Sequence, residues 1–276
     1  MRSTLKKLFA AFWRRNLTFS KLAIVTNLQY RFNFFIDAYL QPTIQIAIES
    51  MLWLALFKLS NNTTIGGFDK NMYLAYVTWA PFLSRIGISW MYEFIMINEV
   101  SSGNLNIVLS RPISFYEYYL SQFMGYKILT TSASLIIPLG FSYFFNLPIQ
   151  YDRIPLALLL IFCYLFLVHN LSFIISSLGF FLTKVGSLTI AKNLTLMFLA
   201  GDLIPIDLFP KELSKIILWL PFASSVYIPA GFISGRCDIN LVWQGFASVF
   251  ISLGVTSVIC RALWKKGLLE YTGTGA

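Results

Sequence analysis

The chain has 276 residues, a formal net charge of +9, and 57% hydrophobic but only 12% charged residues. A soluble domain carries about 25% charged residues, so this composition excludes an ordinary soluble protein and indicates an all-α, polytopic membrane protein. The positive charge does not indicate nucleic-acid binding, because no basic, aromatic-rich groove stands apart from the apolar segments. We therefore expect membrane lipid, and no nucleic acid, among the partners.

The first 31 residues (1–31) are expected to form a basic amphipathic helix that lies on the membrane surface. Leu5, Leu8, Phe9 and Trp13 recur at helical spacing, and lysines and arginines occupy much of the opposite side. Such a helix buries its apolar side in the interface and keeps its cations near anionic head groups. A disordered basic leader is the alternative. A cleavable signal peptide is not expected, because charge interrupts the apolar residues.

Six apolar segments are predicted to span the membrane, since a span needs about 20 residues. They lie approximately at 34–57, 72–96, 118–145, 156–182, 188–204 and 241–263. The N-terminus, the second-to-third and fourth-to-fifth connections and the C-terminus carry 13 Lys/Arg, whereas the other three connections carry six. Because basic connections stay in the cytoplasm, we expect both termini there and one transmembrane domain over residues 1–276.

Residues 202–240, before the last span, are too apolar for a hydrated loop. Pro205, Pro210, Pro221 and Pro229 prevent one straight helix. The apolar pieces between them are too short to cross, so they predict external re-entrant or interfacial helices shielded by protein. A seventh span is the alternative, but an odd number would separate the termini and remove the charge asymmetry.

A polar stripe follows the first span at every fourth residue. It consists of Asn33, Asp37, Gln41, Gln45 and Glu49. Successive members turn by only about 40° around a helix, and polar groups in a span face a partner helix, the bundle interior or a wet cavity. Helix or subunit interface and transport pathway both remain open. Arg85 of the second span lies at a similar depth, which predicts an ion pair with Glu49.

The sequence contains only weak signs of a catalytic, nucleotide-binding or metal-binding site. No phosphate-binding G-x-x-x-x-G-K-[ST] motif occurs, and the three cysteines are isolated. The lone His169 is expected to be a buried, hydrogen-bonded imidazole. The stretch GFISG places its serine one position late for a nucleophile elbow. The chain is therefore not expected to be an enzyme.

Three landmarks, in this order, resemble the permease subunits of type-2 ABC exporters, particularly the drug- and natural-product-resistance branch. QYRFNFF follows the basic N-terminal segment, SSGNLNIVLSRPIS follows the second span, and LAGDLIPIDLFP…LWLPFASSVYIPAGFISG precedes the last span. The second landmark is similar to the family pattern G-x-L-x-x-x-L-x-x-P-[IV]-S. Asn104 departs from the charged residue that relatives often have there.

The resemblance implies a transmembrane permease subunit that forms half of a translocation pathway in an ATP-driven exporter. It implies a second permease, identical or related, and two separate ABC ATPase subunits that hold the ATP and Mg, with no cofactor on this chain. It also implies a multi-pass protein of the bacterial inner (plasma) membrane.

By the same resemblance, residues 98–117 form a cytoplasmic coupling loop. Leu105, Val108 and Leu109 recur at helical spacing, so a short helix can present an apolar edge to a groove. Gly103 permits a tight turn before it and Pro112 stops it. The candidate residues for coupling to the ATPase are Gly103, Leu105, Val108, Leu109, Arg111 and Pro112. A plain surface turn is the alternative.

Other functions remain open from the sequence. A proton-coupled secondary transporter would use Asp37, Glu49 or Glu93 as carriers, but such proteins commonly have repeated halves, which are not visible here. An intramembrane enzyme or a channel subunit are further alternatives. The candidate residues of the pathway or subunit interface are Asp37, Gln41, Gln45, Glu49 and Arg85.

Overall fold

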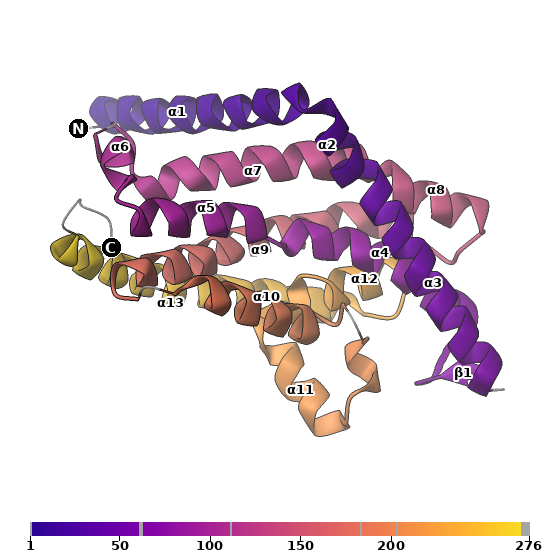
Figure 1. The fold of residues 1–276 in the computed structure, drawn as a ribbon. Helices are drawn as coiled ribbons and strands as arrows, with labels where there is room; N and C mark the ends of the chain where they lie inside the picture. Colours follow the sequence, from indigo (N-terminus) through magenta and orange to yellow (C-terminus); the bar gives the residue numbers. More distant parts are fainter. Residues whose placement is uncertain (1, 61–62, 111, 183, 203, 272–276) are drawn as a thin grey trace.

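The computed structural model describes the backbone of residues 2–60, 63–110, 112–182, 184–202 and 204–271, and the side chains of those from residue 14 onward. Helices dominate it and run side by side in a bundle (Figure 1). The first half contains α1 (Arg2–Gln29), α2 (Arg31–Phe35), the π-helical turn η1 (Ile36–Leu40), α3 (Gln41–Ser60), β1 (Thr64–Ile65), β2 (Phe68–Asp69), α4 (Lys70–Gly87), α5 (Trp90–Ser101), α6 (Leu105–Leu109) and α7 (Phe115–Ser134). The second half contains α8 (Ile136–Phe144), η2 (Tyr151–Arg153), α9 (Ile154–Ser177), η3 (Leu178–Phe180), α10 (Gly186–Ala200), η4 (Ile206–Leu208), α11 (Lys211–Trp219), η5 (Pro221–Ser224), α12 (Tyr227–Ile233) and α13 (Ile239–Glu270).

Three helical stretches in the described part are long and apolar enough to cross a membrane. They are Arg31–Ser60, Tyr151–Phe180 and Ile239–Glu270, with 30, 30 and 32 residues. They coincide with the first, fourth and last predicted spans. The fifth predicted span forms the shorter apolar helix α10, which ends where Gly201 adopts a left-handed conformation (φ 78°).

The second and third predicted spans are each built from two consecutive helices. α4 and α5 are separated at Ile88, whose backbone is extended, and Ser89. α7 and α8 are separated at Leu135, three residues before Pro138. Because proline has no N–H to donate to the preceding turn, Pro138 explains this second break.

The helix α9 forms the centre of the bundle. It contacts α13, α5, α4, α12 and α7, and its side chains are apolar on nearly all sides, as expected for a helix that other helices surround. The helical stretch Arg31–Ser60, called the first long helix below, is different. Most of its side chains are exposed, and its main contact is α4. Figure 1 shows α3 diverging from the other helices and crossing α4 at an angle.

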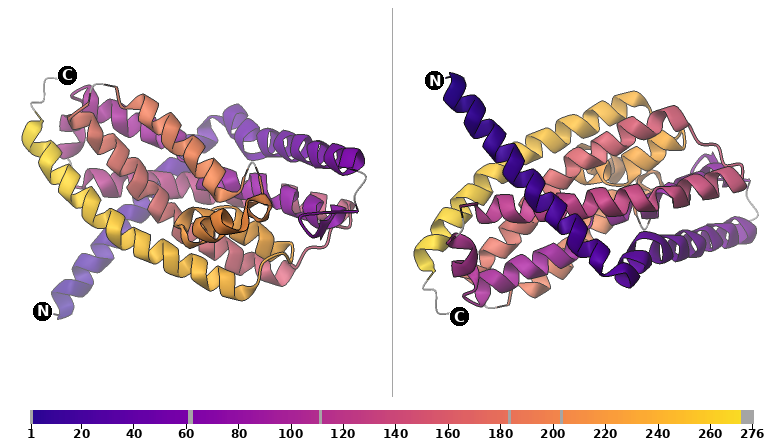
Figure 2. Two further views of the ribbon diagram at one scale, coloured as in Figure 1. Left: turned by 90° about the horizontal axis from the view of Figure 1, so that it is seen from below. Right: turned by 90° about the horizontal axis from the view of Figure 1, so that it is seen from above.

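The N-terminal segment forms one long helix, α1, which confirms the predicted helical structure. Figure 2 shows α1 crossing the bundle obliquely, and its principal contact is α7. Gly125 on α7 permits the close approach, since a Cβ atom there would collide with the backbone of Ser20. The Ser20 hydroxyl donates a hydrogen bond to the Ser121 carbonyl at 2.9 Å. The position of α1 on a membrane surface stays a prediction.

Residues 202–240 contain only short helical pieces in their described part, as the prolines predict. Pro210 precedes α11, Pro221 opens η5, and Pro229 lies within α12. All residues of α12 are buried, with contacts to α4, α9 and α13, so protein shields its backbone. The place of these helices relative to a membrane stays a prediction.

Candidate functional site

The predicted coupling loop lies at the end of the bundle where the chain begins and ends (Figure 1). Gly103 has φ 79°, a left-handed conformation that glycine adopts without strain. The short helix α6 follows this turn, and α7 begins after Pro112 and Ser114. The predicted order of turn, short helix and stop is thus present. Arg111 lies outside the described residues.

The apolar residues of α6 divide between two faces. Leu105 and Val108 are buried in the chain's own core, at 0% and 3% exposure, whereas Leu109 is 45% exposed and Ile107 56% exposed. Residues three apart share a helical face, while the next residue is turned by about 100°. The expected single edge of Leu105, Val108 and Leu109 is therefore not presented outward in this structure. The available apolar surface is Ile107 with Leu109, and its role in ATPase binding stays a prediction.

Both ends of the chain hold this segment in place. Arg15 of α1 donates to the Pro112 carbonyl at 3.1 Å and forms an ion pair of 2.8 Å with Glu117 at the start of α7. After α13, the Tyr271 hydroxyl donates to the Gly103 carbonyl at 2.7 Å. Sequence reasoning missed these contacts, because residues more than 90 positions apart give no local signal.

Two residues of the polar stripe, Asp37 and Gln41, contact Arg85. The guanidinium donates to the Gln41 side-chain oxygen at 2.5 Å and to the Asp37 backbone carbonyl at 2.7 Å. The Asp37 carboxylate accepts from the Tyr126 hydroxyl at 3.3 Å, and Lys127 donates to the Arg85 carbonyl at 2.7 Å. Asp37 lies in the π-helical turn η1, a distortion that often occurs at functional sites.

The predicted ion pair between Arg85 and Glu49 is wrong. Arg85 binds Gln41 and Asp37 instead, and Glu49 accepts from Gln45 at 3.0 Å, one turn away on its own helix. The depth comparison assumed two parallel spans, but α3 crosses α4 at an angle, so equal counts along the chain do not give equal levels.

The stripe lies beside the contact of the first long helix with the bundle, not within it. The buried residues of this helix are Ala38, Pro42, Ile46, Trp53 and Phe57. Asp37, Gln41 and Gln45 each precede one of them and are therefore turned by about 100°. Gln41 is exposed, and Asp37, Gln45 and Glu49 are half-buried. The stripe is thus open on one side, where a partner or a transported molecule can reach it.

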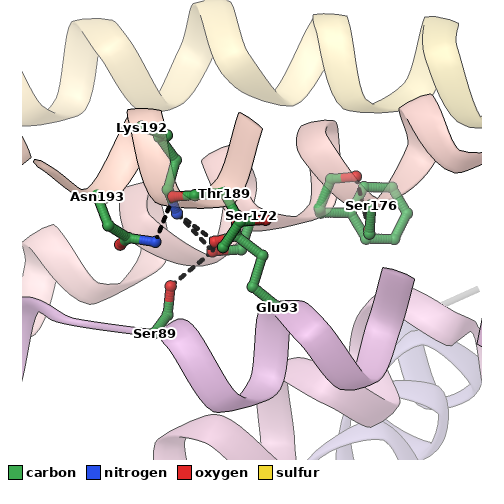
Figure 3. A network of polar contacts seen from close by, with 8 residues as sticks. Ser89, Glu93, Ser172, Ser176, Thr189, Lys192 and Asn193 are labelled. Atoms are coloured by element: carbon green, nitrogen blue, oxygen red, sulfur yellow. Dashed lines mark hydrogen bonds and ion pairs between the residues drawn. The ribbon is translucent and has the colours of Figure 1, made fainter. Parts of the chain in front are cut away.

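A second polar group lies between α5, α9 and α10 (Figure 3). Lys192 of α10 forms an ion pair with the fully buried Glu93 of α5. Ser172 of α9 donates to Glu93 at 2.8 Å and shares a hydrogen bond of 2.7 Å with Ser89. The network joins three helices. This pairing was not predicted from the sequence, although opposite charges in two predicted spans were an available signal.

A third charged group links residues 202–240 to the β1–β2 hairpin and α4. Arg236 forms an ion pair with Asp207 and lies over the rings of Phe68 and Tyr73, at 4.1 and 4.4 Å from their centroids. Burial lowers the pKa of Arg236, but the Asp207 carboxylate, Tyr73 and Tyr76 together raise it more, so the net pKa lies above its usual value. The guanidinium therefore stays charged and fixes these segments together.

The described residues contain no group of three or more His, Cys, Asp or Glu side chains that could hold a metal ion. His169 is buried, and its Nε2 lies 3.1 Å from the Tyr116 carbonyl oxygen, which confirms the predicted hydrogen-bonded imidazole. The three cysteines are free.

Three long apolar helices within one helical bundle define a membrane protein with membrane-spanning helices. Residues 43–275 match the family described as ABC-2 family transporter protein. The chain belongs to this family, whose membrane subunits are typically non-catalytic and imply ABC ATPase partners. No curated protein matches the chain.

Proposed function

We propose that the chain is the permease subunit of an ATP-driven exporter, in which two permeases form the pathway and each binds a separate ABC ATPase. The observation that carries the proposal is the turn and short helix of residues 103–114, in a chain that belongs to this family. A short helix is anchored by buried Leu105 and Val108 and tied to both chain ends, and it leaves Ile107 and Leu109 exposed.

The proposed topology has six spans with both termini in the cytoplasm. The spans are Arg31–Ser60, α4 with α5, α7 with α8, Tyr151–Phe180, α10, and α13. Two spans are each divided between two helices, and each pair is long enough to cross at 1.5 Å per residue. The excess of Lys/Arg at the end with α6 supports the cytoplasmic assignment. Residues 202–240 then lie on the external side as re-entrant helices.

Coupling requires that a displacement of α6 reaches the spans. Residues 98–117 connect the end of α5 directly to the start of α7, without a long flexible linker. From α5, the Glu93–Lys192 pair and Ser172 extend the connection to α10 and α9. ATP-driven closure of the ATPases can therefore act on several spans through one short element.

The polar stripe supports a place for the pathway or for the second permease. Its half-exposed side chains lie on the first long helix, most of whose side chains are exposed within the subunit. Polar groups that face only lipid are costly, so a second subunit or a wet pathway is expected to cover this side.

The test is the double variant Ile107→Asp with Leu109→Asp, which adds two charges to the exposed part of α6. The swap Ile107→Leu with Leu109→Ile is the control, since it keeps the surface apolar. We expect the charged variant to insert normally but lose the ATPase on co-purification, or to retain it with hydrolysis no longer driving export from proteoliposomes. Normal ATPase retention and normal export in the charged variant would contradict the proposed coupling role.

A further inference from the structure

A cavity of about 550 Å³ lies between α1, the α2–η1 segment, α5 and α7. Small-molecule sites usually have volumes of about 300–1,000 Å³, so this cavity is large enough for a ligand. Its lining includes the exposed apolar side chains of Leu22, Met91 and Ile95. A ligand with an apolar part can therefore reach it from the side of the bundle, without passing through the protein.

The lining is aromatic and acidic. Five tyrosines contribute to it, namely Tyr30, Tyr92, Tyr118, Tyr119 and Tyr126. The two charged side chains among the described lining residues are the carboxylates Asp37 and Glu99, and neither lysine nor arginine occurs there. Tyrosine rings attract cations through their negative faces. The composition thus favours a positively charged ligand over a neutral or negative one.

The two carboxylates differ in how their charge is balanced. Asp37 accepts from Tyr126 and lies in electrostatic range of Arg85, which belongs to a neighbouring cavity. Glu99 has no ion pair among the described residues, and its Oε2 atom is buried without a hydrogen-bond partner there. Because a buried polar atom without a partner is costly, the Oε2 atom of Glu99 is the group that a bound cation would complete.

The rings of the wall are held in place by contacts with neighbouring rings. Tyr92 and Tyr126 have centroids 5.8 Å apart, and Tyr92 also lies 5.7 Å from Phe123. Tyr118 contacts Phe19 of α1 edge-on at 5.3 Å. The helices that carry these rings meet α6 and its tethers, because α5 and α7 flank the coupling loop.

We propose that this cavity binds an amphiphilic organic cation, with its ammonium or phosphonium group near Glu99 and its apolar groups against the tyrosine rings. The inference rests on the proposed function in one respect: the cation is taken to be a molecule or lipid that the exporter transports. The binding chemistry itself is a property of this chain and can be measured without an ATPase.

The test compares two ions of the same shape and opposite charge. Tetraphenylphosphonium and tetraphenylborate are titrated against the full-length protein in phosphatidylglycerol nanodiscs, with empty nanodiscs subtracted. We expect the phosphonium to bind at least about tenfold more tightly than the borate, because a nearby carboxylate attracts one and repels the other. Equal binding of the two ions would overturn the proposal.

Variants locate the site. Glu99→Gln keeps the shape of the side chain and is expected to weaken phosphonium binding about tenfold or more, while the exposed Glu212→Gln leaves it unchanged. Tyr92→Leu should weaken binding a few-fold, and Tyr92→Phe should not, because the ring and not the hydroxyl attracts the cation. Unchanged phosphonium affinity in both Glu99→Gln and Tyr92→Leu would refute the assignment.

A lipid head group can supply the same ammonium chemistry as a free amphiphile. Repeating the titration with phosphatidylethanolamine in the nanodiscs separates the two sources. A Glu99-dependent loss of phosphonium affinity identifies the lipid ammonium as a competitor for the site, whereas unchanged affinity assigns the site to free amphiphiles. Either result keeps the cation site, and neither depends on ATPase binding, so failure of the proposed coupling role would be seen separately.

Discussion

The polar stripe of the first long helix and the Glu93 network between α5, α9 and α10 are both polar groups among apolar helices, but their surroundings differ. Glu93 is fully buried, and its charge is paired with Lys192 inside the same subunit. The stripe has partners on one side only, and Gln41 is exposed. A closed group holds the subunit together, whereas an open group remains available to something outside it.

The largest expected effect follows from breaking the closed group. Glu93→Gln leaves Lys192 without its counter-charge in a buried position, and we expect a loss of about 3–5 kcal/mol in stability. The double variant Glu93→Gln with Lys192→Met should recover part of this loss, because no unpaired charge remains. Thermal unfolding in detergent measures both.

The exposed pair Glu212–Lys215 provides the control for that prediction. Its side chains are 84% and 69% exposed, and Glu212→Gln is expected to change stability by only about 0–1 kcal/mol. If Glu93→Gln were no more destabilising than Glu212→Gln, the distinction between the closed network and an ordinary surface pair would be lost.

Changing the open group should affect stability less and transport more. Gln45→Ala removes one side-chain hydrogen bond to Glu49 within the same helix. Even side-chain bonds between two membrane helices average only about 0.6 kcal/mol. We expect nearly unchanged unfolding but reduced export or reduced association of the two permeases, measured in proteoliposomes and by cross-linking. A variant with normal export and normal association would show that the stripe only stabilises its own helix.

The variants with the smallest expected effect are single cysteines, which test which end of the molecule is cytoplasmic. Single cysteines at Ser102 and Thr63, both exposed, are labelled with a membrane-impermeant maleimide in sealed cells. We expect labelling at Thr63 and none at Ser102. Burial raises the pKa of the native Cys237 to about 12, so little reactive thiolate exists at pH 7–8 and its background is low. Strong labelling at Ser102 would reverse the topology.

The helical elements could be predicted from the sequence because each depends on residues close together in the chain. The apolar length of 156–182 predicted the central helix, and the four prolines predicted the short pieces of 202–240. The family resemblance, carried by Gly103 to Ser114, agrees with the family match. The division of the second span at Ser89 was not predicted, although Gly87, a weak helix former, ends α4 beside it.

The partners of the polar residues could not be predicted because they depend on how the helices cross. Arg85 was assigned to Glu49 on the assumption of parallel spans, and the pairing of Lys192 with Glu93 was not predicted. The outward direction of Leu105 was also misjudged, since helical spacing shows that residues share a face but not which neighbour the face meets. These errors all concern contacts between segments distant in sequence.

The two contacts that hold the coupling segment also set an order of assembly. Arg15 lies 102 positions before Glu117, and Tyr271 lies 168 positions after Gly103. During synthesis, α1 is made before α7 and cannot bind it until α2 to α6 have also been made. The hydrogen bond from Tyr271 forms only after α13 has been made. A chain that stops before Tyr271 therefore lacks a finished α6 site, so the surface proposed for the ATPase is completed only after the helices α7 to α13.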